Sequence, residues 1–176
     1  MRSIARIIAL ITGLIGGVLF SQAPELAQQY RQRIGGAIDE LRVIVDDFDR
    51  QARQNTLDRA EALNLYAISS EQFLKQQGDT MKRTINRYEI LEQQQASLAS
   101  ASPVLKPLIL LQDADAAILQ NTWRDFIPAI PVSLPGLIWG GIGFVTAWYL
   151  SGLAALLSRS AYRLGAGRRY RLLYKK

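Results

Sequence analysis

The sequence contains no cysteine and no histidine among its 176 residues. Their absence excludes a thiol nucleophile, an imidazole base, a disulfide and the usual zinc sites. The sequence has no recognisable nucleophile motif either, so we expect a protein that is not an enzyme, with no catalytic residue, no cofactor and no metal site. The missing cysteines do not fix the compartment, because a periplasmic domain can fold without disulfides.

Charged residues are missing from two long stretches of the sequence. Residues 7–24 form an uncharged run of 18 residues, and residues 126–158 form a second run of 33. At 1.5 Å per residue the first run makes a helix of about 27 Å, close to the ~30 Å hydrocarbon core of a bilayer. The second run is broken by prolines up to Pro135, a good first-turn residue, so we place its helix at residues 135–158. The sequence therefore predicts two transmembrane helices.

The distribution of charge predicts how these two helices are oriented. The tails, residues 1–6 and 159–176, hold nine basic residues and no acid, whereas the segment between the helices holds 12 basic and 15 acidic residues. Lys and Arg near the ends of transmembrane helices stay in the cytoplasm. We therefore expect a bacterial inner-membrane protein with both termini in the cytoplasm and residues 25–134 in the periplasm.

The first apolar run also fits a cleavable signal peptide. Arg2 and Arg6 would form its basic region, and Ser21-Gln22-Ala23 fits a small-residue cleavage site. Cleavage there would fall before Pro24, whose fixed φ suits a peptidase poorly, so we prefer a retained helix. Under either interpretation the second helix anchors the same external domain.

Small residues recur every four positions in both predicted transmembrane helices. This spacing lets helix backbones approach closely in lipid. We prefer packing of the two helices together, or a homodimer, over docking onto another membrane subunit. The predicted helix-packing residues are Ala9, Gly13, Gly17 and Ser21 in the first helix and Gly143, Ala147, Ser151 and Ala155 in the second, where Gly136 and Gly140 form another short ridge. Neither helix contains an ionisable residue, which argues against an ion pathway or transport site.

The C-terminal tail combines cations with tyrosines. Juxtamembrane cations attract anionic lipid headgroups by about 1 kcal/mol each. Arg-rich tails also bind nucleic acid or acidic proteins, but we prefer lipid contact and expect no nucleic-acid partner. The predicted lipid-contacting residues are Arg159, Arg163, Arg168, Arg169, Arg171, Lys175 and Lys176.

Residues 25–134 have helical spacing and few strand signals. An apolar heptad predicts a first long helix that ends near Gln54, and a second long helix follows from about Met81. We expect the two to pack as an antiparallel hairpin, or to pair between subunits as a coiled coil. The heptad positions are Ala27, Ile34, Leu41 and Phe48 with Tyr30, Ala37, Ile44 and Gln51. The predicted fold is an all-α membrane protein with two transmembrane helices flanking a periplasmic helical domain.

Shorter helices are expected around the two long ones. Asn55 or Thr56 is expected to cap one of them, and Gly78 to end the next. Asp113 is expected to cap a later helix that runs to about residue 123. Residues 123–126 (Trp-Arg-Asp-Phe) suit the core or the membrane interface, and we prefer this interpretation over a partner-binding site.

Acidic residues cluster late in the first long helix of the central domain. Hard oxygen ligands of this kind bind Ca²⁺ or Mg²⁺, and paired carboxylates also perform acid–base hydrolysis. No calcium-binding loop accompanies the cluster, so we prefer a solvated helix face balanced by Arg42, Arg50 and Arg53. The acidic residues are Asp39, Glu40, Asp46, Asp47 and Asp49.

Three segments carry a resemblance to a known family. They are FSQAPELAQQYRQRIGGAIDEL (residues 20–41), MKRTINRYEILEQQ (residues 81–94) and TWRDFIPAIP (residues 122–131). The sequence resembles a family of small two-span inner-membrane proteins of proteobacteria, catalogued as a domain of unknown function. The resemblance covers most of the chain except the far C-terminus. It implies an inner-membrane location and assigns no catalytic or binding residue.

These observations lead to two expectations for function. The first is a non-enzymatic accessory, scaffold or assembly subunit of a membrane complex, or a homo-oligomer, acting through its periplasmic domain and its small-residue helices. The second is a periplasmic sensor that signals through a separate partner, because the C-terminal tail is too short for an output domain. Under the first, the partners are the lipid bilayer and another protein or a second copy, and no small-molecule substrate is expected.

Overall fold

The chain is helical throughout the part that the structure, a computed structural model, describes. That part is the backbone of residues 2–173 and the side chains of residues 4 and 6–157, and it contains no strand. The chain divides into two compact units: a terminal unit, Met1–Glu25 with Pro128–Lys176, and a central unit, Leu26–Ile127. The prediction of an all-helical chain is confirmed.

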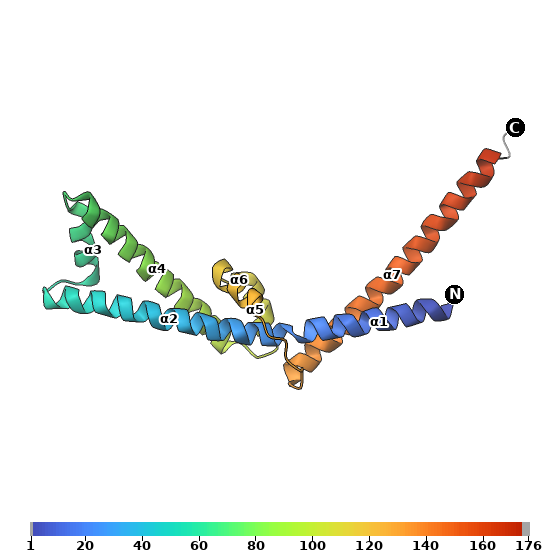
Figure 1. The fold of residues 1–176 in the computed structure, drawn as a ribbon, viewed down its shortest axis with the longest axis horizontal. Coiled ribbons are helices and arrows are strands. Elements are labelled where there is room, and N and C mark those ends of the chain that lie inside the picture. The colour runs from blue at the N-terminus through green and yellow to red at the C-terminus, as the bar shows by residue number, and fades with distance from the viewer. Residues whose placement is uncertain (1, 174–176) are drawn as a thin grey trace. The chain divides into compact units, whose positions relative to one another are not determined.

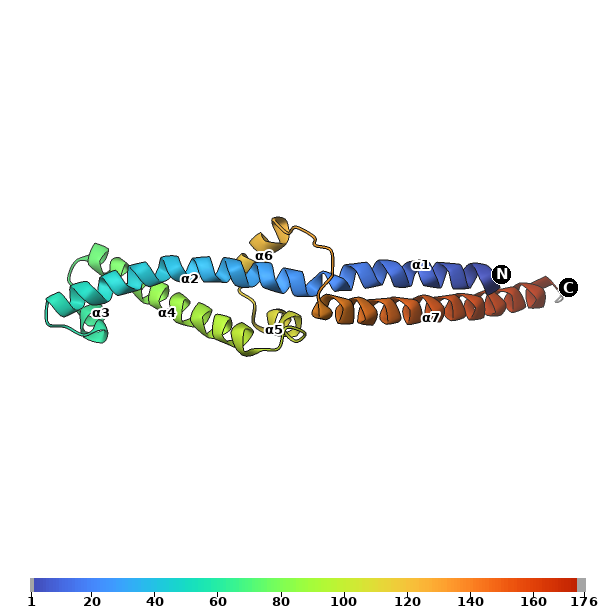
Figure 2. The same cartoon turned by 90° about the horizontal axis from the view of Figure 1, so that it is seen from below.

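The terminal unit consists mainly of two helices that pack against each other, α1 (Arg2–Ser21) and α7 (Leu134–Leu173) (Figures 1 and 2). The Ser133 hydroxyl accepts a hydrogen bond from the Gly136 amide and so caps α7, which begins one residue before the predicted start. The backbone of α7 continues as helix well past residue 158, where we expected the membrane helix to end.

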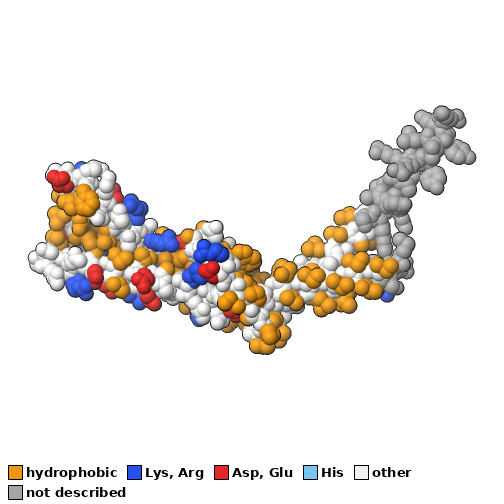
Figure 3. Space-filling model, in the orientation of Figure 1, with side chains coloured by type: hydrophobic (Ala, Val, Ile, Leu, Met, Phe, Trp, Pro, Cys, Tyr) orange, Lys and Arg blue, Asp and Glu red, His pale blue; other side chains and the backbone are white. Residues whose placement is uncertain are grey.

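Two described helical segments are long and apolar enough to cross a membrane. They lie within Arg6–Gln54 and Leu134–Leu157, and only 17% and 6% of their apolar windows are buried. The core helix of a soluble protein is mostly buried, whereas these helices present their apolar side chains outward. Figure 3 shows hydrophobic side chains covering the described surface of α1 and α7. By length and composition, then, the chain has the two apolar helices that the sequence predicts.

The central unit is built from five helices around a core of aliphatic side chains. The helices are α2 (Ala23–Gln54, which starts in the terminal unit), α3 (Arg59–Ile68), α4 (Gln72–Ser100), α5 (Lys106–Asp113) and α6 (Ala116–Arg124). Early α2 residues meet late α4, α5 and α6 residues in one cluster, and late α2 residues meet early α4 in another. Figure 1 shows α2 and α4 running in opposite directions, joined through α3.

The buried face of α2 follows the repeat of a straight helix. Its buried side chains recur after 18 residues, as in the pairs Ala27/Val45, Tyr30/Phe48 and Ile34/Ala52. Eighteen residues are five turns at 3.6 residues per turn, whereas a heptad repeats every 3.5. The predicted heptad positions Ile44 and Gln51 are accordingly exposed, because a straight helix rotates them away from the core.

Gly78 lies inside a helix, although we expected it to end one. The helix α4 runs without interruption from Gln72 to Ser100, and Gly78 is buried within it. A Cβ at this position would lie 2.5 Å from the Cβ of Tyr66 in α3. Only glycine leaves room for α3 to pack so closely against α4, which is the physical reason that the prediction was wrong.

Two of the expected helix caps are aspartates at other positions. Asp58 caps α3 in a capping box with Glu61, in place of Asn55 or Thr56. Asp115 caps α6 by accepting a hydrogen bond from the Ile118 amide, in place of Asp113. Both predictions put the cap two or three residues too early, because several residues in these loops are suitable caps and the local sequence does not select among them.

Candidate functional site

Helices α1 and α7 meet through glycines. A Cβ at Gly16 would lie 2.5 Å from the Ala147 Cβ and 2.7 Å from the Gly143 carbonyl oxygen. A Cβ at Gly13 would lie 2.9 Å from the Phe144 ring. At these positions the backbone of one helix touches side chains and carbonyls of the other, which is the close approach that small residues permit in lipid.

The structure places much of the first predicted stripe against α7. Ala9, Gly13 and Ser21 are buried, and a Cβ at Gly17 would lie 3.1 Å from the Gly140 carbonyl oxygen. The sequence pattern missed Gly16, which has the closest approach of the first helix. Gly16 precedes Gly17 and lies one turn after Gly13, so a search for small residues at three-residue as well as four-residue spacing would have found it.

The second predicted stripe splits into two parts. Gly143 and Ala147 meet Gly16 at the crossing, whereas Ser151 and Ala155 lie further along α7, where they are half-buried. The Ser151 hydroxyl donates a hydrogen bond to the Trp148 carbonyl of its own helix.

The predicted lipid-contacting cations of the tail have side chains outside the described residues. They are Arg159, Arg163, Arg168, Arg169, Arg171, Lys175 and Lys176.

A buried tyrosine organises the junction of α2, α4 and α6 in the central unit. The Tyr30 hydroxyl donates a hydrogen bond to Gln94 Oε1 at 3.0 Å and accepts one from the Asp115 amide at 2.8 Å. Burial raises the pKa of Tyr30, and Arg87 forms an ion pair with the Asp115 carboxylate. With its hydroxyl satisfied on both sides, Tyr30 has a structural role in this core.

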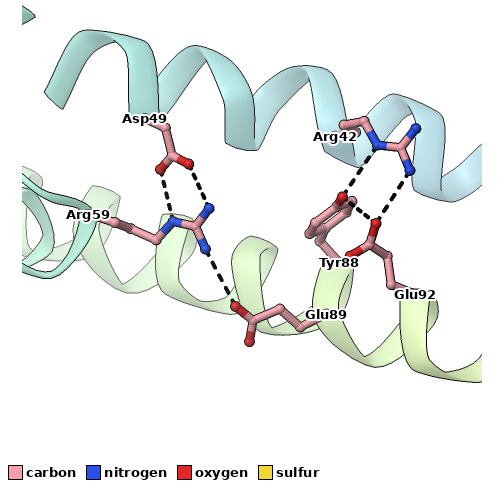
Figure 4. A network of polar contacts seen from close by, with 6 residues as sticks. All are labelled: Arg42, Asp49, Arg59, Tyr88, Glu89 and Glu92. Carbon is pink, nitrogen blue, oxygen red and sulfur yellow. Dashed lines mark hydrogen bonds and ion pairs between the residues drawn. The ribbon is translucent and has the colours of Figure 1, made fainter. Parts of the chain in front are cut away.

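Arg59 links three helices of the central unit (Figure 4). Its guanidinium donates two hydrogen bonds to the Asp49 carboxylate, at 2.8 and 2.6 Å, and a longer one to Glu89. The bond from Arg59 lowers the pKa of Asp49, whose side chain is only 17% exposed. Because both oxygens of Asp49 accept hydrogen bonds from one guanidinium, the pair fixes the orientation of α3 relative to α2, which a single point charge would not do.

Arg42 forms a second bridge between α2 and α4. Its guanidinium donates hydrogen bonds to the Tyr88 hydroxyl and to Glu92, and Tyr88 in turn donates to Glu92 (Figure 4). These groups connect the two long helices through a polar cluster at the surface.

Three members of the acidic cluster of α2 pair with separate arginines. Asp39 pairs with Arg42, and Asp47 pairs with Arg50 one turn away. Among the described residues, no group of three or more His, Cys, Asp or Glu side chains could hold a metal ion. The pairs of Asp39 and Asp47 lie along the helix face as we preferred, whereas Asp49 pairs with Arg59 of α3.

Residues 123–126 lie at the surface of the central unit. The rings of Trp123 and Phe126 stack with centroids 6.2 Å apart, and Trp123 remains 68% exposed. Asp125 pairs with Arg33 of α2 at 2.8 Å, and this hydrogen bond lowers the pKa of Asp125. Trp123 is therefore not a core residue of the central unit. Of the two positions that we expected for it, the core and the membrane interface, the first is wrong.

Large apolar side chains also lie exposed where α3 meets α4. This surface, which we name the apolar tip, consists of Leu65, Ile68, Phe73 and Leu74, which are 53%, 69%, 66% and 39% exposed. Figure 3 shows hydrophobic side chains gathered at this end of the central unit. The sequence alone does not distinguish these residues from core residues, because their spacing is also that of a short core helix.

A shallow polar groove runs between α2 and α4. Its volume is ≈ 720 Å³, and both glycines of the Gly35-Gly36 pair line it. Nothing lies within 4 Å of a Cβ placed at Gly36. The other lining residues are Arg31, Gln32, Asp39, Glu92, Gln95, Ala96 and Ala99.

Comparison with known proteins supplies a family and no activity. Residues 4–164 match a family described as a protein of unknown function (DUF2937). No curated protein and no solved structure matches the chain. Any function has to be inferred from the residues and contacts described above, since fold alone does not imply function.

Proposed function

We propose that this chain, which belongs to the DUF2937 family of proteins of unknown function, is a non-enzymatic protein of the proteobacterial inner membrane that assembles with other proteins. It acts as an accessory, scaffold or assembly subunit of a membrane complex, or as a homo-oligomer. In this proposal α1 and the first part of α7 cross the bilayer. Both termini are cytoplasmic, and the central unit is a periplasmic helical hairpin.

Two observations support membrane insertion with this orientation. The apolar windows of α1 and α7 are mostly exposed, so water would face a large apolar surface if these helices were in solution. The two ends of the chain, residues 1–6 and 159–176, carry nine cations and no acid, which favours the cytoplasm for both ends.

The apolar tip is the observation that carries the assembly role. Soluble surfaces rarely expose several large apolar side chains side by side, and such patches mark interaction sites. Ile68 and Phe73 are each about two-thirds exposed, although the unit buries other residues of the same type, such as Ile85. A protein partner, or a second copy, would cover this surface.

Affinity capture of the tagged full-length protein from gently solubilised membranes tests this role. We expect mass spectrometry to recover a stoichiometric partner or a homo-oligomer. The double variant Ile68→Ser with Phe73→Ser should lower that recovery at least about tenfold, because loss of an interface anchor commonly costs ~2 kcal/mol or more.

The matched control replaces two exposed apolar residues elsewhere in the same unit. Val43 and Ile90 are 61% and 45% exposed and lie outside the apolar tip. Val43→Ser with Ile90→Ser should leave recovery unchanged. Equal recovery from the tip variant and the control would exclude the tip as the docking surface.

Sensing is the alternative function, and the polar groove between α2 and α4 favours it. A groove lined by side chains of both charges suits a small polar ligand better than a helix of a partner. Gly36→Leu would place an apolar side chain in the groove, at a position where a Cβ meets open space. A sensor predicts that this variant changes partner recovery only under envelope stress, whereas a scaffold predicts no change in either condition.

A further inference from the structure

An open crevice separates α1 from α7 on the side of the crossing nearer the two termini. Its volume is ≈ 900 Å³, within the ~300–1,000 Å³ typical of ligand sites. From α1 it is lined by Arg6 and Ala9, and from α7 by a longer wall of apolar residues that starts at Phe144 and ends at Leu156.

The crevice follows from a change of side-chain size along α7. At the crossing, Gly140 and Gly143 let the α1 backbone come close. One turn further, Trp148 packs edge-on against Phe144 with centroids 5.3 Å apart, and both rings line the crevice. Figure 1 shows α1 and α7 diverging beyond the crossing. Gly152, the next small residue in the wall, has no atom of the described residues within 4 Å of a Cβ placed on it, so the space beside it is open to them.

Charge determines which occupant the crevice fits. Among the described residues that line the crevice, Arg6 is the charged one, and the only acid in the sequence of the terminal unit is Glu25. Along a helix, the 19 residues from Arg6 to Glu25 span about 28 Å, beyond the reach of an ion pair. An anion bound at Arg6 would therefore come from outside the unit, and a second copy in the same orientation would bring further cations rather than an anion.

We propose that this crevice binds one anionic glycerophospholipid, with its phosphate on the Arg6 guanidinium and an acyl chain along the α7 wall. The proposal rests on the membrane insertion proposed above. Under that topology Arg6 lies at the cytoplasmic face, whose leaflet carries anionic lipid. The guanidinium offers a fork of N–H donors that matches phosphate oxygens, and the apolar wall gives the acyl chain a fixed surface.

Two variants remove the two halves of this site. Arg6→Gln removes the charge and keeps a polar, though shorter, side chain. Gly152→Leu adds a side chain to the crevice from α7, at a position where a Cβ meets none of the described residues within 4 Å. Each has a matched control: Arg171→Gln removes one cation fifteen positions past Leu156, and Gly141→Leu adds the same side chain at another open glycine, which does not line the crevice.

Quenching of Trp148 fluorescence by brominated lipids measures occupancy of the crevice. The full-length protein carries Trp123→Phe and Trp139→Phe, so that Trp148 is the remaining tryptophan of the three. It is reconstituted into phosphatidylcholine vesicles that contain phosphatidylglycerol brominated on its acyl chains, or brominated phosphatidylcholine at the same fraction. We expect the phosphatidylglycerol to bind about fivefold more tightly, the ratio that corresponds to ~1 kcal/mol for one juxtamembrane cation.

The variants and their controls separate binding in the crevice from other causes of quenching. Arg6→Gln should bring the ratio to about one, and Gly152→Leu should reduce quenching by both lipids, while both controls match the parent protein. Equal loss of the ratio in Arg171→Gln would overturn the proposal, because it would show attraction to surface charge in general. Quenching unchanged in Gly152→Leu, with loss of a dimer, would overturn it in favour of a second copy. Release of the protein from vesicles by an alkaline wash would instead contradict the proposed membrane insertion itself.

Discussion

At the scale of single residues, glycines have two different roles in this chain, and the neighbouring atoms decide which. Gly78 and Gly16 lie where another helix comes within contact of the backbone, and an added Cβ would lie 2.5 Å from a neighbouring side chain at each position. Gly36 lies on a helix surface with no neighbour within 4 Å. The first two permit packing, whereas the third costs helix stability without an intramolecular gain.

Alanine substitutions separate these roles. Gly78→Ala should lower the stability of the central unit by about 1–2 kcal/mol, because overpacking against Tyr66 outweighs the gain in helix propensity. Gly36→Ala, the control, should raise it by about 0.5–1 kcal/mol, because only the propensity changes. The midpoint of thermal unfolding of the full-length protein, followed by circular dichroism at 222 nm, should move in opposite directions. A rise in both variants would show that α3 can shift away from Gly78.

The ion pair of Asp49 predicts a dependence of stability on pH. The hydrogen bond from Arg59 lowers the pKa of Asp49 in the folded protein below the ordinary value of 3.8. The unfolded chain therefore binds a proton first, so the pair stabilises the fold above pH 3.8 and this contribution is lost as the pH falls through the folded pKa. The difference in unfolding midpoint between the parent protein and Asp49→Asn should be largest near neutral pH and shrink in acid.

The control for this titration is Asp47→Asn on the same helix. Asp47 pairs with Arg50, but its side chain is 47% exposed, against 17% for Asp49. Exposed pairs contribute little, about 0–1 kcal/mol, so this variant should differ less from the parent protein at every pH. A larger effect of Asp47→Asn than of Asp49→Asn would contradict the structural role given to Arg59.

At the scale of elements, the crossing of α1 and α7 decides whether the two apolar helices belong to one packed pair. Gly140 lies opposite Ser21, and a Cβ at Gly140 would lie 3.4 Å from the Ser21 Cβ. Disulfides join Cβ atoms about 3.5–4.5 Å apart, so this pair suits a cross-link. Because the sequence has no cysteine of its own, any disulfide that forms must join introduced cysteines.

Cysteine cross-linking tests this contact directly. Ser21→Cys with Gly140→Cys should form a disulfide within one chain on mild oxidation, detected by protection from a maleimide mass label and by a monomer on a non-reducing gel. Ser21→Cys with Gly141→Cys is the matched control and should stay reduced, because Gly141 has no neighbour within 4 Å. A dimer from the first pair would assign the contact to two copies, the homodimer that the small-residue stripes also allow.

At the scale of the whole molecule, the two compact units coincide closely with the change in charge along the chain. The central unit contains 14 of the 15 acids, and the terminal unit contains one acid with nine cations. This separation underlies the proposed topology, in which the central unit is periplasmic and both ends are cytoplasmic.

Labelling of intact cells tests this topology. A cysteine at Gly36, where the side chain would meet open space, should react with a membrane-impermeant maleimide before lysis. A cysteine added after Lys176 should react only after the membrane is opened. Labelling of the C-terminal cysteine in intact cells would overturn the proposed orientation, and labelling of neither would place the central unit inside the cell.

Helices and apolar runs could be predicted from the sequence alone, because both depend on neighbours within one or two turns. The absence of charge over residues 7–24 and 135–158 is such a property, and so is the spacing of apolar residues in α2 and α4. The all-helical character and the two apolar helices followed from it. The charge of the tails and the absence of cysteine and histidine can likewise be known from the sequence alone.

The tertiary structure decided which residue does what within those helices. Gly78 was expected to end a helix, and its contact with Tyr66 instead keeps it inside one. Gly16, the apolar tip and the crevice beside Arg6 depend on atoms supplied by other helices, in two of these cases from more than a hundred residues away. Local spacing carries no information about contacts between segments that are far apart in the sequence. These surfaces therefore exist only in the tertiary structure.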